Sequence, residues 1–585
     1  MRNPHLATFT THDNVALSYR HWPALTAATA SAPRAIVLFH RGHEHGGRVA
    51  HLVDELDLPD CAFFAWDARG HGLSPGARGD SPSFGTSVRD IQTFMQHIST
   101  DYGIQLEDII VVAQSVGAVL AATWVHDYAP PIRALVLASP AFKVKLYVPF
   151  ARTGLKLLRA WRGNFFVNSY VKAKFLTHDP ERIASYESDP LIARPISVDV
   201  LLGLYDAADR VVANAQSIHT PVQLLISGSD FVVHRKPQLK FFQQLSSVDK
   251  ELHILPGFFH DTLGEQKREL ATQRIRRFIT HHFATPSTAP ALHTADRQGW
   301  SYAEAQTLAA ELPPLSPAGL YWRTTRASLA WGGKISASLH LGAQTGFDSG
   351  SMLDYVYRNQ ATSNNHLGRL IDRNYLKAIG WRGIRQRKVH IEELLHDAIQ
   401  RLDAAHTPVH IVDIAAGHGR YILEALAHNA DQVASVLLRD YSPLNVSQGT
   451  RLIAEKGLEN NARFVQGDAF DRQDLAQLTP QPTLAVVSGL YELFADNTQV
   501  EQSLAGLADA MQPGAYLIYT NQPWHPQLEF IARALTSHRE GEAWVMRRRS
   551  QAEMDQLVAR AGFKKITQRV DEWGIFTVSL AQRVD

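Results

Sequence analysis

The sequence predicts an α/β protein with two doubly wound sheets, one after the other along the chain. The chain has 585 residues, well above the size that one hydrophobic core supports. In both halves, short apolar runs typical of buried parallel strands alternate with helical stretches. A proline-rich segment at 285–317 separates the halves. We therefore expect a first domain at 1–284, a linker at 285–317 and a second domain that extends to residue 585.

The overall composition limits the partners and the compartment. The formal net charge is +1, from 58 Lys and Arg against 57 Asp and Glu, which predicts no general affinity for nucleic acid. The single cysteine, Cys61, excludes an intramolecular disulfide and a cluster of metal-bound thiolates. The first residues contain no apolar signal segment, and no run reaches the ~20 apolar residues of a membrane span. We expect a cytoplasmic protein.

Five apolar runs predict the parallel strands of the first domain. They are Ala35–Phe39, Cys61–Trp66, the run 111–114, Ala134–Ser139 and Val222–Gly228. Polar, glycine-containing loops follow the first two, at His40–Arg48 and Asp67–Ser74. Loops at the carboxyl ends of such strands are where functional sites collect.

Ser115 is the first candidate for chemistry. It lies at a predicted strand-to-helix junction, where a strained turn exposes Oγ and leaves the next backbone N–H to hold an oxyanion. The usual pattern is G-x-S-x-G, and here Ala113 takes the first position. Asp230 and His260 each follow a later strand, in the order that the α/β-hydrolase topology requires. The alternative is an ordinary turn serine, a turn aspartate and a surface histidine, which needs three strand-end positions to coincide by chance.

Four motifs carry a family resemblance over residues 1 to about 284. They are His40-x-Gly42-x-Glu44-His45, Asp67-x-Arg69-Gly70-His71-Gly72-x-Ser74, the segment around Ser115, and Tyr186-Glu187-Ser188-Asp189-Pro190-Leu191. With them this half resembles the α/β-hydrolases of the serine aminopeptidase S33 type, in their monoacylglycerol lipase and lysophospholipase branch. The resemblance implies that Ser115 is the nucleophile, His260 its base and Asp230 the group that orients the imidazole. It also implies an oxyanion hole made by the backbone N–H groups of Gly42 and Val116.

Two features of the loop after the first strand need separate treatment. Arg41 stands where the branch usually has glycine, and a side chain at this position can crowd the oxyanion hole or reach an anionic head group, two alternatives that the sequence leaves open. A zinc site formed by His40, His43 and His45 is an alternative, but alternating spacing in a loop is poor evidence for one. We interpret these histidines as loop-packing groups and expect no metal.

The resemblance places a lid at about 141–215. Between residues 141 and 178 the sequence has no acidic residue and eight basic ones: Lys143, Lys145, Arg152, Lys156, Arg159, Arg162, Lys172 and Lys174. Interleaved with them are Phe142, Tyr147, Phe150, Leu155, Leu157, Leu158, Trp161, Phe165, Phe166 and Tyr170. This mixture is typical of a surface that contacts anionic lipid, so we expect peripheral contact with the inner face of a membrane. The alternative is a solvated charged face over ordinary lid packing.

The second half begins with a predicted helical segment at 318–389, and a helix is expected from about Val389 to Leu402. A strand, glycine loop and helix then follow, with Asp413-x-Ala415-x-Gly417-x-Gly419 in the loop. Glycines there let the backbone approach a ligand at a helix N-terminus. Further strands are predicted at Ser435–Asp440, Arg463–Gln466, the run from Leu484, and Tyr516–Thr520, with a terminal pair at Phe563–Arg569 and Ile575–Leu580.

Acidic residues at these strand ends indicate a nucleotide-like cofactor. Asp440 lies 21 residues past Gly419, where it accepts ribose hydroxyls. Residues 390–585 resemble a class I S-adenosylmethionine-dependent methyltransferase, with 318–389 as its helical lid and Ala415 in place of a glycine. The resemblance implies that S-adenosylmethionine is the cofactor, that Asp468 and Ala469 frame its adenine, and that Asp413 lies near its methionine end. A nicotinamide dehydrogenase is the rival, and the Asp468 position and the antiparallel ending favour the methyltransferase.

The methyl acceptor is less constrained. The segment from Ser488 to Glu492 lies where substrates meet the sulfonium, with Ser488 also a cofactor contact. Tyr491 and Glu492 are candidates to orient or deprotonate the acceptor, and the alternative is that both are structural. Alignment and desolvation alone suffice for transfer from a sulfonium.

The sequence thus predicts a serine hydrolase that cleaves a lipid acyl ester, a monoacylglycerol or lysophospholipid, fused to a methyltransferase with a lipid-related acceptor. One rival is a thioesterase or acyltransferase joined to a small-molecule methyltransferase. Another is an active esterase whose second half binds the cofactor only as a regulatory domain.

Overall fold

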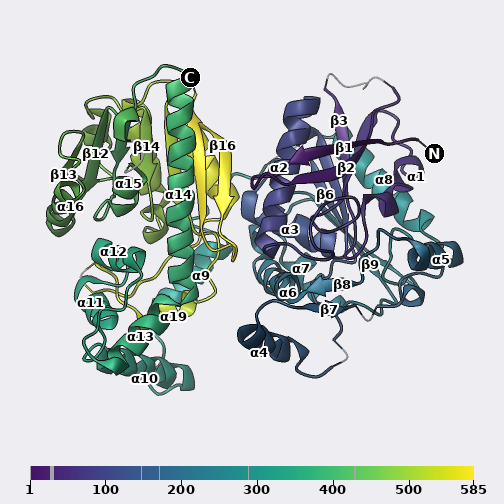
Figure 1. Ribbon diagram of the computed structural model, residues 1–585, viewed down its shortest axis with the longest axis horizontal. Helices are drawn as coiled ribbons and strands as arrows, with labels where there is room; N and C mark the ends of the chain where they lie inside the picture. Colours follow the sequence, from purple (N-terminus) through teal and green to yellow (C-terminus); the bar gives the residue numbers. More distant parts are fainter. Residues whose placement is uncertain are drawn as a thin grey trace. The chain divides into compact units, whose positions relative to one another are not determined.

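The computed structural model describes residues 2–26, 32–146, 148–169, 171–286, 289–426, 430–539 and 541–584. It divides into two compact units, Met1–Pro290 and Ala291–Asp585, and each contains its own sheet (Figure 1). The predicted α/β class is confirmed. The lid residues Tyr147 and Tyr170 and the linker residues Ser287 and Thr288 lie outside the described residues.

The first unit is built on an eight-stranded sheet with the order β1-β2-β4-β3-β5-β6-β9-β10. The strands are β1 (His5–Thr10), β2 (Ala16–Trp22), β3 (Arg34–Phe39), β4 (Cys61–Trp66), β5 (Ile109–Gln114), β6 (Ala134–Ala138), β9 (Val222–Ser227) and β10 (Lys250–Leu255). From β4 to β10 all neighbours are parallel, and Phe39 lies opposite Ala113, so β3 and β5 end together. The antiparallel β1 and β2 were not predicted, because β1 is mostly exposed and lacks a continuous apolar run.

Helices and an insertion complete this unit. The helices α2 (Phe84–Tyr102), α3 (Val116–Tyr128), α7 (Arg235–Gln244) and α8 (Glu269–Ala284) accompany a sheet whose strands β4, β5, β6 and β9 are buried at every residue. The insertion predicted as a helical lid lies between β6 and β9. It contains α4 (Ala151–Arg162), β7 (Phe166–Asn168), α5 (Pro180–Ser188), β8 (Pro195–Ser197) and α6 (Val198–Ala213).

The second unit is built on a seven-stranded sheet with the order β13-β12-β11-β14-β15-β17-β16. The strands are β11 (His410–Asp413), β12 (Ser435–Asp440), β13 (Ala462–Gln466), β14 (Leu484–Val487), β15 (Tyr516–Asn521), β16 (Phe563–Val570) and β17 (Thr577–Arg583). The first five are parallel, and β17 runs antiparallel to both β15 and β16. The strands and the terminal antiparallel pair match those expected from the apolar runs.

The helices of this unit form two groups. The long α14 (Ile379–Ala404) contacts β15, β16 and β17, while α15 (Arg420–Ala425), α16 (Pro443–Glu455), α18 (Asn497–Ala510) and α20 (Gln551–Arg560) also accompany the sheet. The helices α10 (Pro317–Gly332), α11 (Ala337–Thr345), α12 (Gly350–Arg358), α13 (His366–Leu376) and α19 (Leu528–Ala534) gather beyond one end of it (Figure 1).

The predicted start of α14 needs correction. The helix begins at Ile379, ten residues before the expected Val389, so the boundary proposed at 389/390 falls inside one helix. Its first turns include Gly380 and Gly383, which lower helix propensity and disguised it. Tight packing offsets this cost, because a Cβ on Gly383 would lie 3.0 Å from the ring of Phe576.

The predicted linker is also too long. Residues from Ala291 onward belong to the second unit, and α9 (Trp300–Ala309) is held there by side-chain pairs. Arg548 binds Glu304 through two hydrogen bonds of 2.6 Å, and the backbone N–H of Leu292 donates to Gln556. The proline content predicted a spacer, and nothing in the sequence indicated these contacts because the partners are distant along the chain. Within the described ranges, no helix has the length and apolar character needed to cross a membrane.

Candidate functional sites

The first candidate site begins at the end of β5. Ser115 has φ 56° and ψ −116°, a strained conformation for a residue with a side chain, and α3 starts at the next residue. Gly117 is required by close approach, since a Cβ there would lie 2.4 Å from the carbonyl oxygen of His40. The chain therefore turns sharply from strand to helix at the serine, as the sequence pattern predicts.

The structure brings the three predicted residues together. Oγ of Ser115 lies 2.7 Å from Nε2 of His260, and Nδ1 of His260 lies 2.8 Å from Oδ2 of Asp230. All three side chains are buried. The arrangement is a serine hydrogen-bonded to an imidazole that a carboxylate orients.

Asp230 is held in its ionised form. Its Oδ1 accepts hydrogen bonds from the backbone N–H groups of Val232 at 2.7 Å and Val233 at 3.0 Å. Burial works to raise the pKa of this carboxyl, but His260 and the two N–H groups together lower it below its ordinary value. The negative charge remains opposite Nδ1, where it stabilises an imidazolium.

The predicted oxyanion-hole residues are adjacent. A Cβ on Gly42 would lie 2.9 Å from Cγ2 of Val116, so only glycine lets the loop after β3 pack this closely on the start of α3. The loop is fixed by buried His40, whose Nδ1 lies 2.7 Å from the Arg41 carbonyl and whose Nε2 accepts from the N–H of Ala68 at 3.1 Å. His40 therefore packs the loop, as predicted.

Arg41 takes neither of the two roles left open by the sequence. Its guanidinium neither crowds the oxyanion hole nor is available to a head group, because it is buried and paired with Glu44 through bonds of 3.0 and 2.6 Å. It also lies 3.5 Å from Asp261, which binds Arg182 of α5 at 2.6 Å. Gln114 donates to Asp261 at 3.2 Å. This buried ionic cluster joins the loop, the lid and the residues next to Ser115 and His260.

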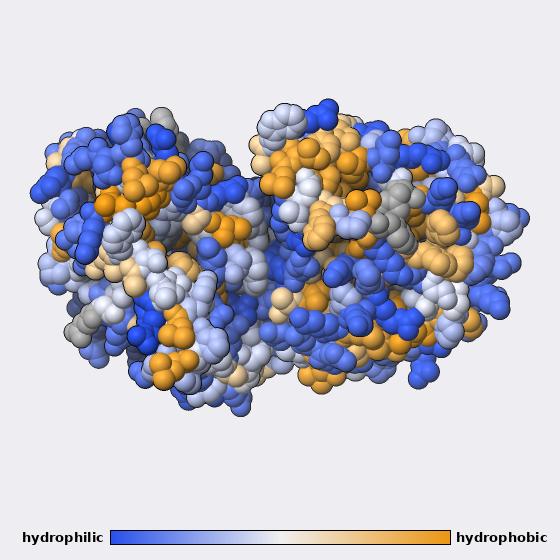
Figure 2. All heavy atoms as spheres, turned by 90° about the horizontal axis from the view of Figure 1, so that it is seen from below, coloured by the Kyte–Doolittle hydropathy of each residue, from blue (hydrophilic) through white to orange (hydrophobic). Residues whose placement is uncertain are grey.

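The lid surface is mixed in character. Three of the predicted cations are paired with acids of α6: Arg152 with Asp206 and Asp209, Lys156 with Asp206, and Arg159 with Asp199. Large apolar side chains on and before α4 are nevertheless exposed, including Phe150 at 87% and Trp161 at 85%. The helix lies at the lower edge of Figure 1, the side from which Figure 2 is seen, and apolar patches are visible there.

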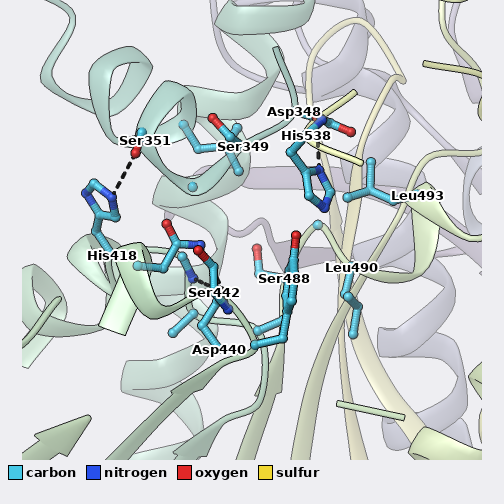
Figure 3. A pocket seen from close by; sticks show the side chains of 18 of the residues that line it. Asp348, Ser349, Ser351, His418, Asp440, Ser442, Ser488, Leu490, Leu493 and His538 are labelled. Atoms are coloured by element: carbon cyan, nitrogen blue, oxygen red, sulfur yellow. Dashed lines mark hydrogen bonds and ion pairs between the residues drawn. The ribbon is translucent and has the colours of Figure 1, made fainter. Parts of the chain in front are cut away.

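The second candidate site is a pocket of about 640 Å³ in the second unit. Figure 3 shows Asp440, Ser442 and Ser488 on its sheet side and Asp348, Ser349 and His538 across from them. Of the predicted cofactor residues, those on its wall are Ala415, Gly417, Gly419, Asp440, Asp468, Ala469 and Ser488. Residues from four strand ends and from the segment before α12 thus share one cavity.

The glycine loop is supported by Asp440. Gly417 and Gly419 have φ of 58° and 73°, which favours glycine at both positions. Oδ2 of Asp440 accepts from the N–H of Gly417 at 3.0 Å, and its Oδ1 accepts from Ser442 and Asn445. Burial raises the pKa of Asp440, although these hydrogen bonds oppose the shift.

Asp413 is not on the pocket wall, and the prediction for it needs correction. It is fully buried beneath the loop, where it accepts hydrogen bonds from the hydroxyl of Tyr421 and from the N–H of Ala415. Burial raises its pKa to about 7, against these two hydrogen bonds, and Asp440 adds to the rise. Asp413 therefore shapes the loop from below.

The other predicted residues differ in accessibility. Ser488 is on the wall, and its Oγ is buried with no hydrogen-bond partner within the described part of the chain. Tyr491 is not at an acceptor site, as it is buried and hydrogen-bonded to Ser503 at 3.0 Å. Glu492, its neighbour, lines a second cavity.

The sequence reasoning missed the residues opposite the strand ends. Asp348 and Ser349 lie between Gly346 and Gly350, and Ser349 caps α12 by accepting from the N–H of Met352. A polar pair between glycines before a helix is a usable signal for a ligand loop. His538 gave no such signal, because only the fold places it 3.0 Å from Asp348.

Comparisons with known proteins match both halves. Residues 30–267 match the family described as "Serine aminopeptidase, S33", and residues 275–583 match the family described as "Putative methyltransferase". The chain is 58% identical over 577 residues to the "Uncharacterized protein YnbC" of Escherichia coli K12, covering 99% of this chain and 98% of that protein.

Two lipases resemble the first half alone. The chain is 27% identical over 296 residues to the monoglyceride lipase of Homo sapiens, covering 49% of this chain and 93% of that protein. It is 24% identical over 258 residues to the monoacylglycerol lipase of Mycolicibacterium smegmatis, covering 43% and 89%. The two resemblances stated from the motifs are confirmed.

The buried ionic cluster generates a stability prediction. Arg41→Ala leaves Glu44 without its bidentate partner in a buried site, so the free energy of unfolding should fall by about 3–5 kcal/mol. Arg152→Ala is the matched control, because it breaks two ion pairs with exposed aspartates and should cost less than about 1 kcal/mol. Urea denaturation of the full chain measures both, and equal losses would contradict the role given to the cluster.

Proposed function

We propose that the chain is a bifunctional enzyme. It belongs to the same family as the Escherichia coli K12 protein YnbC, which it matches over nearly its full length, and it unites an S33-type α/β-hydrolase domain with a methyltransferase-family domain. The first domain cleaves a lipid acyl ester, a monoacylglycerol or lysophospholipid. The second transfers a methyl group from S-adenosylmethionine to a lipid-related acceptor. The observation that carries the first activity is the hydrogen-bonded series from Ser115 through His260 to Asp230.

The geometry supports acyl transfer in two steps. His260 takes the proton of the Ser115 hydroxyl as Oγ attacks the ester carbonyl, and the backbone N–H groups of Gly42 and Val116 stabilise the oxyanion. His260 then returns the proton to the departing alcohol. Water attacks the acyl-enzyme by the same route, with His260 again as the base. The charge of Asp230 stabilises the imidazolium in both steps.

The residues of the second pocket fit the proposed cofactor. Gly417 and Gly419 let the backbone approach a ligand, Asp440 offers carboxylate oxygens at the end of β12, and Ser488 lies on the wall. Asp440 would hold the ribose hydroxyls, and Asp468 with Ala469 would frame the adenine. When bound, S-adenosylmethionine supplies an electrophilic methyl group on a sulfonium. The chain then has to hold the acceptor in line and exclude water.

Peripheral membrane contact is part of the proposal. Leu157 and Trp161 are four residues apart on α4, which places them on one helix face, and they are 68% and 85% exposed. Because several lid cations are paired within the lid, the contact depends on apolar insertion more than the sequence suggested. A lipase-like site beneath such a lid would receive its substrate from a membrane surface.

The hydrolase activity has a direct chemical test. A fluorophosphonate probe should label the wild-type chain at Ser115, because the activated Oγ attacks phosphorus as it would a carbonyl, and Ser115→Ala should abolish the label. Ser188→Ala, at an exposed serine of α5, is the control and should label normally. Labelling is read by intact-mass spectrometry. An unlabelled wild type, or a labelled Ser115→Ala, would refute the assignment.

Cofactor binding is tested by calorimetry. S-adenosylmethionine should bind the wild type, and Asp440→Ala should weaken binding at least about tenfold, because hydrogen bonds to a charged group and the support of Gly417 are lost. Asp509→Ala removes an exposed carboxylate paired with Arg472 and should bind as the wild type does. The cofactor site would be wrong if the wild type gave no heat of binding, or if Asp440→Ala bound equally well.

The lid proposal predicts vesicle binding. The double variant Leu157→Ser/Trp161→Ser should bind vesicles of phosphatidylcholine and phosphatidylglycerol at least about tenfold more weakly, since each side chain contributes about 1.5–3 kcal/mol when buried. Val248→Ser, at a 90% exposed residue outside the lid, is the control. Flotation assays measure the bound fraction. Unchanged binding of the double variant would show that α4 does not enter the lipid.

A further inference from the structure

A second cavity of about 210 Å³ adjoins the cofactor pocket in the second unit. The two share the wall residues Asp348, Leu353, Gly489 and Leu493. The remaining walls are mainly apolar and aromatic, and include Tyr375, Trp381, Ile384, Phe530, Trp544 and Phe576. A mainly apolar cavity with a few polar groups, next to a cofactor pocket, is the usual form of a small-molecule site.

Arg387 is the first unusual polar group on this wall. It lies on the inner face of α14, one turn from Ile384 and Ile391, and is 2% exposed. Its guanidinium packs against Gly489, where a Cβ would lie 2.9 Å from Nη2, and its Cζ lies 5.0 Å from the centre of the Phe576 ring. Nε and Nη2 have no hydrogen-bond partner among the residues that the structure describes.

Glu492 is the second unusual polar group on the cavity wall. It follows β14 and is 7% exposed, and its Oε1 accepts from Oγ1 of Thr520 at 2.7 Å. Oε1 lies 3.7 Å from Nη1 of Arg387, which is an ion pair without a good hydrogen bond. Oε2 is buried and unpartnered across the described ranges. Burial opposes the charge of Arg387, yet Tyr357 and Glu492 raise its pKa, so the guanidinium stays protonated.

Arg387 and Glu492 lack the complete hydrogen bonding that an ordinary buried salt bridge has. A buried charged group left without hydrogen bonds costs free energy, and this pair leaves two donors and one acceptor unused. Nε1 of Trp544, on the same wall, is a further unpartnered buried donor. A ligand that completes these hydrogen bonds would therefore gain affinity from groups that are already positioned.

The opposite charges of Arg387 and Glu492 determine which ligand chemistry fits between them. A carboxylate would satisfy Arg387 but would bring a like charge next to Glu492. A pure hydrocarbon would fill the apolar walls and leave all the polar atoms unpaired. A hydroxyl group satisfies both, because its O–H donates to Oε2 of Glu492 and its oxygen accepts from Arg387.

We propose that this cavity binds the methyl acceptor, and that the acceptor is a mainly apolar molecule whose hydroxyl group lies between Arg387 and Glu492. The assignment of the bound molecule as the acceptor rests on the proposed methyltransferase function. The hydroxyl is then held at the boundary with the cofactor pocket, where the shared residues Gly489 and Leu493 lie.

Three small probes of similar shape test the selectivity by calorimetry on the full chain, without cofactor. They are 4-ethylphenol, 4-ethyltoluene and 4-ethylbenzoate, which differ in the hydroxyl, methyl or carboxylate at one position. We expect 4-ethylphenol to bind at least about tenfold more tightly than each of the others, because only it pairs with both charged groups. Equal binding of 4-ethylphenol and 4-ethyltoluene, tighter binding of 4-ethylbenzoate, or no binding of any probe would overturn the proposal.

A matched pair of double variants locates the selectivity. Arg387→Met/Glu492→Leu removes both charges together, so no single buried charge is left, and should abolish the preference for 4-ethylphenol. Arg382→Met/Glu572→Leu removes an exposed pair of the same residue types, whose arginine also lies on α14, and should keep the preference. Retention of the preference in the first variant would refute the role of Arg387 and Glu492.

Binding of S-adenosylmethionine to each variant separates folding from selectivity. Normal cofactor binding by Arg387→Met/Glu492→Leu shows that the second unit is folded. If the wild type selects 4-ethylphenol but never binds S-adenosylmethionine, the methyltransferase function fails while the hydroxyl-selective cavity stands.

Discussion

Both candidate sites depend on one constraint, the meeting of parallel strands at a point where the chain changes direction across the sheet. In the first unit β3 leads outward to β4, while β5 leads the other way to β6, and these two strands are neighbours. In the second unit β11 leads to β12 and β14 leads to β15, again from neighbouring strands. Loops that leave such a pair diverge and open a crevice at the carboxyl ends. Gly42 and Ser115 lie at one crevice, and the glycine loop and Ser488 at the other.

Two buried arginines show how the same residue type serves structure in one unit and recognition in the other. Arg41 is paired with Glu44 through two hydrogen bonds and lies close to Asp261, so its charge is used within the fold. Arg387 has one carboxylate at 3.7 Å and unpartnered nitrogens in the part of the chain described. Each position costs desolvation energy, which the two direct hydrogen bonds of Arg41 offset more fully than the longer contact of Arg387 with Glu492. The difference in partners, which a sequence cannot show, separates the two roles.

The sequence predicted those parts of the sites that lie immediately after apolar strands. Ser115, Asp230, His260 and Asp440 could be identified because each follows its own apolar strand closely in the sequence, and the ends of parallel strands converge in the fold. The sequence could not show which of two adjacent loop residues faces a cavity. In the short turn at Tyr491–Leu493, Tyr491 is buried against Ser503, whereas Glu492 lines a cavity. Arg387 was invisible for another reason, because its burial depends on Phe576, nearly two hundred residues further along the chain. The first turns of α14 were missed because their glycines lower helix propensity. That residues 291–310 belong to the second unit was missed because their partners, such as Arg548 and Gln556, are distant in the sequence.

The chemistry of the second cavity also bears on how the two activities relate. Ester cleavage at Ser115 would release a fatty acid and an alcohol. The carboxylate of a fatty acid would lie against Glu492, so the acid product is disfavoured as a methyl acceptor. Glycerol offers hydroxyls but no apolar body for walls such as Trp381 and Phe530. Neither product of monoacylglycerol cleavage therefore combines a hydroxyl with an apolar body. The uncleaved ester has both features, because it carries free hydroxyls and an acyl chain, and it matches the chemistry that Arg387 and Glu492 select better than either product does.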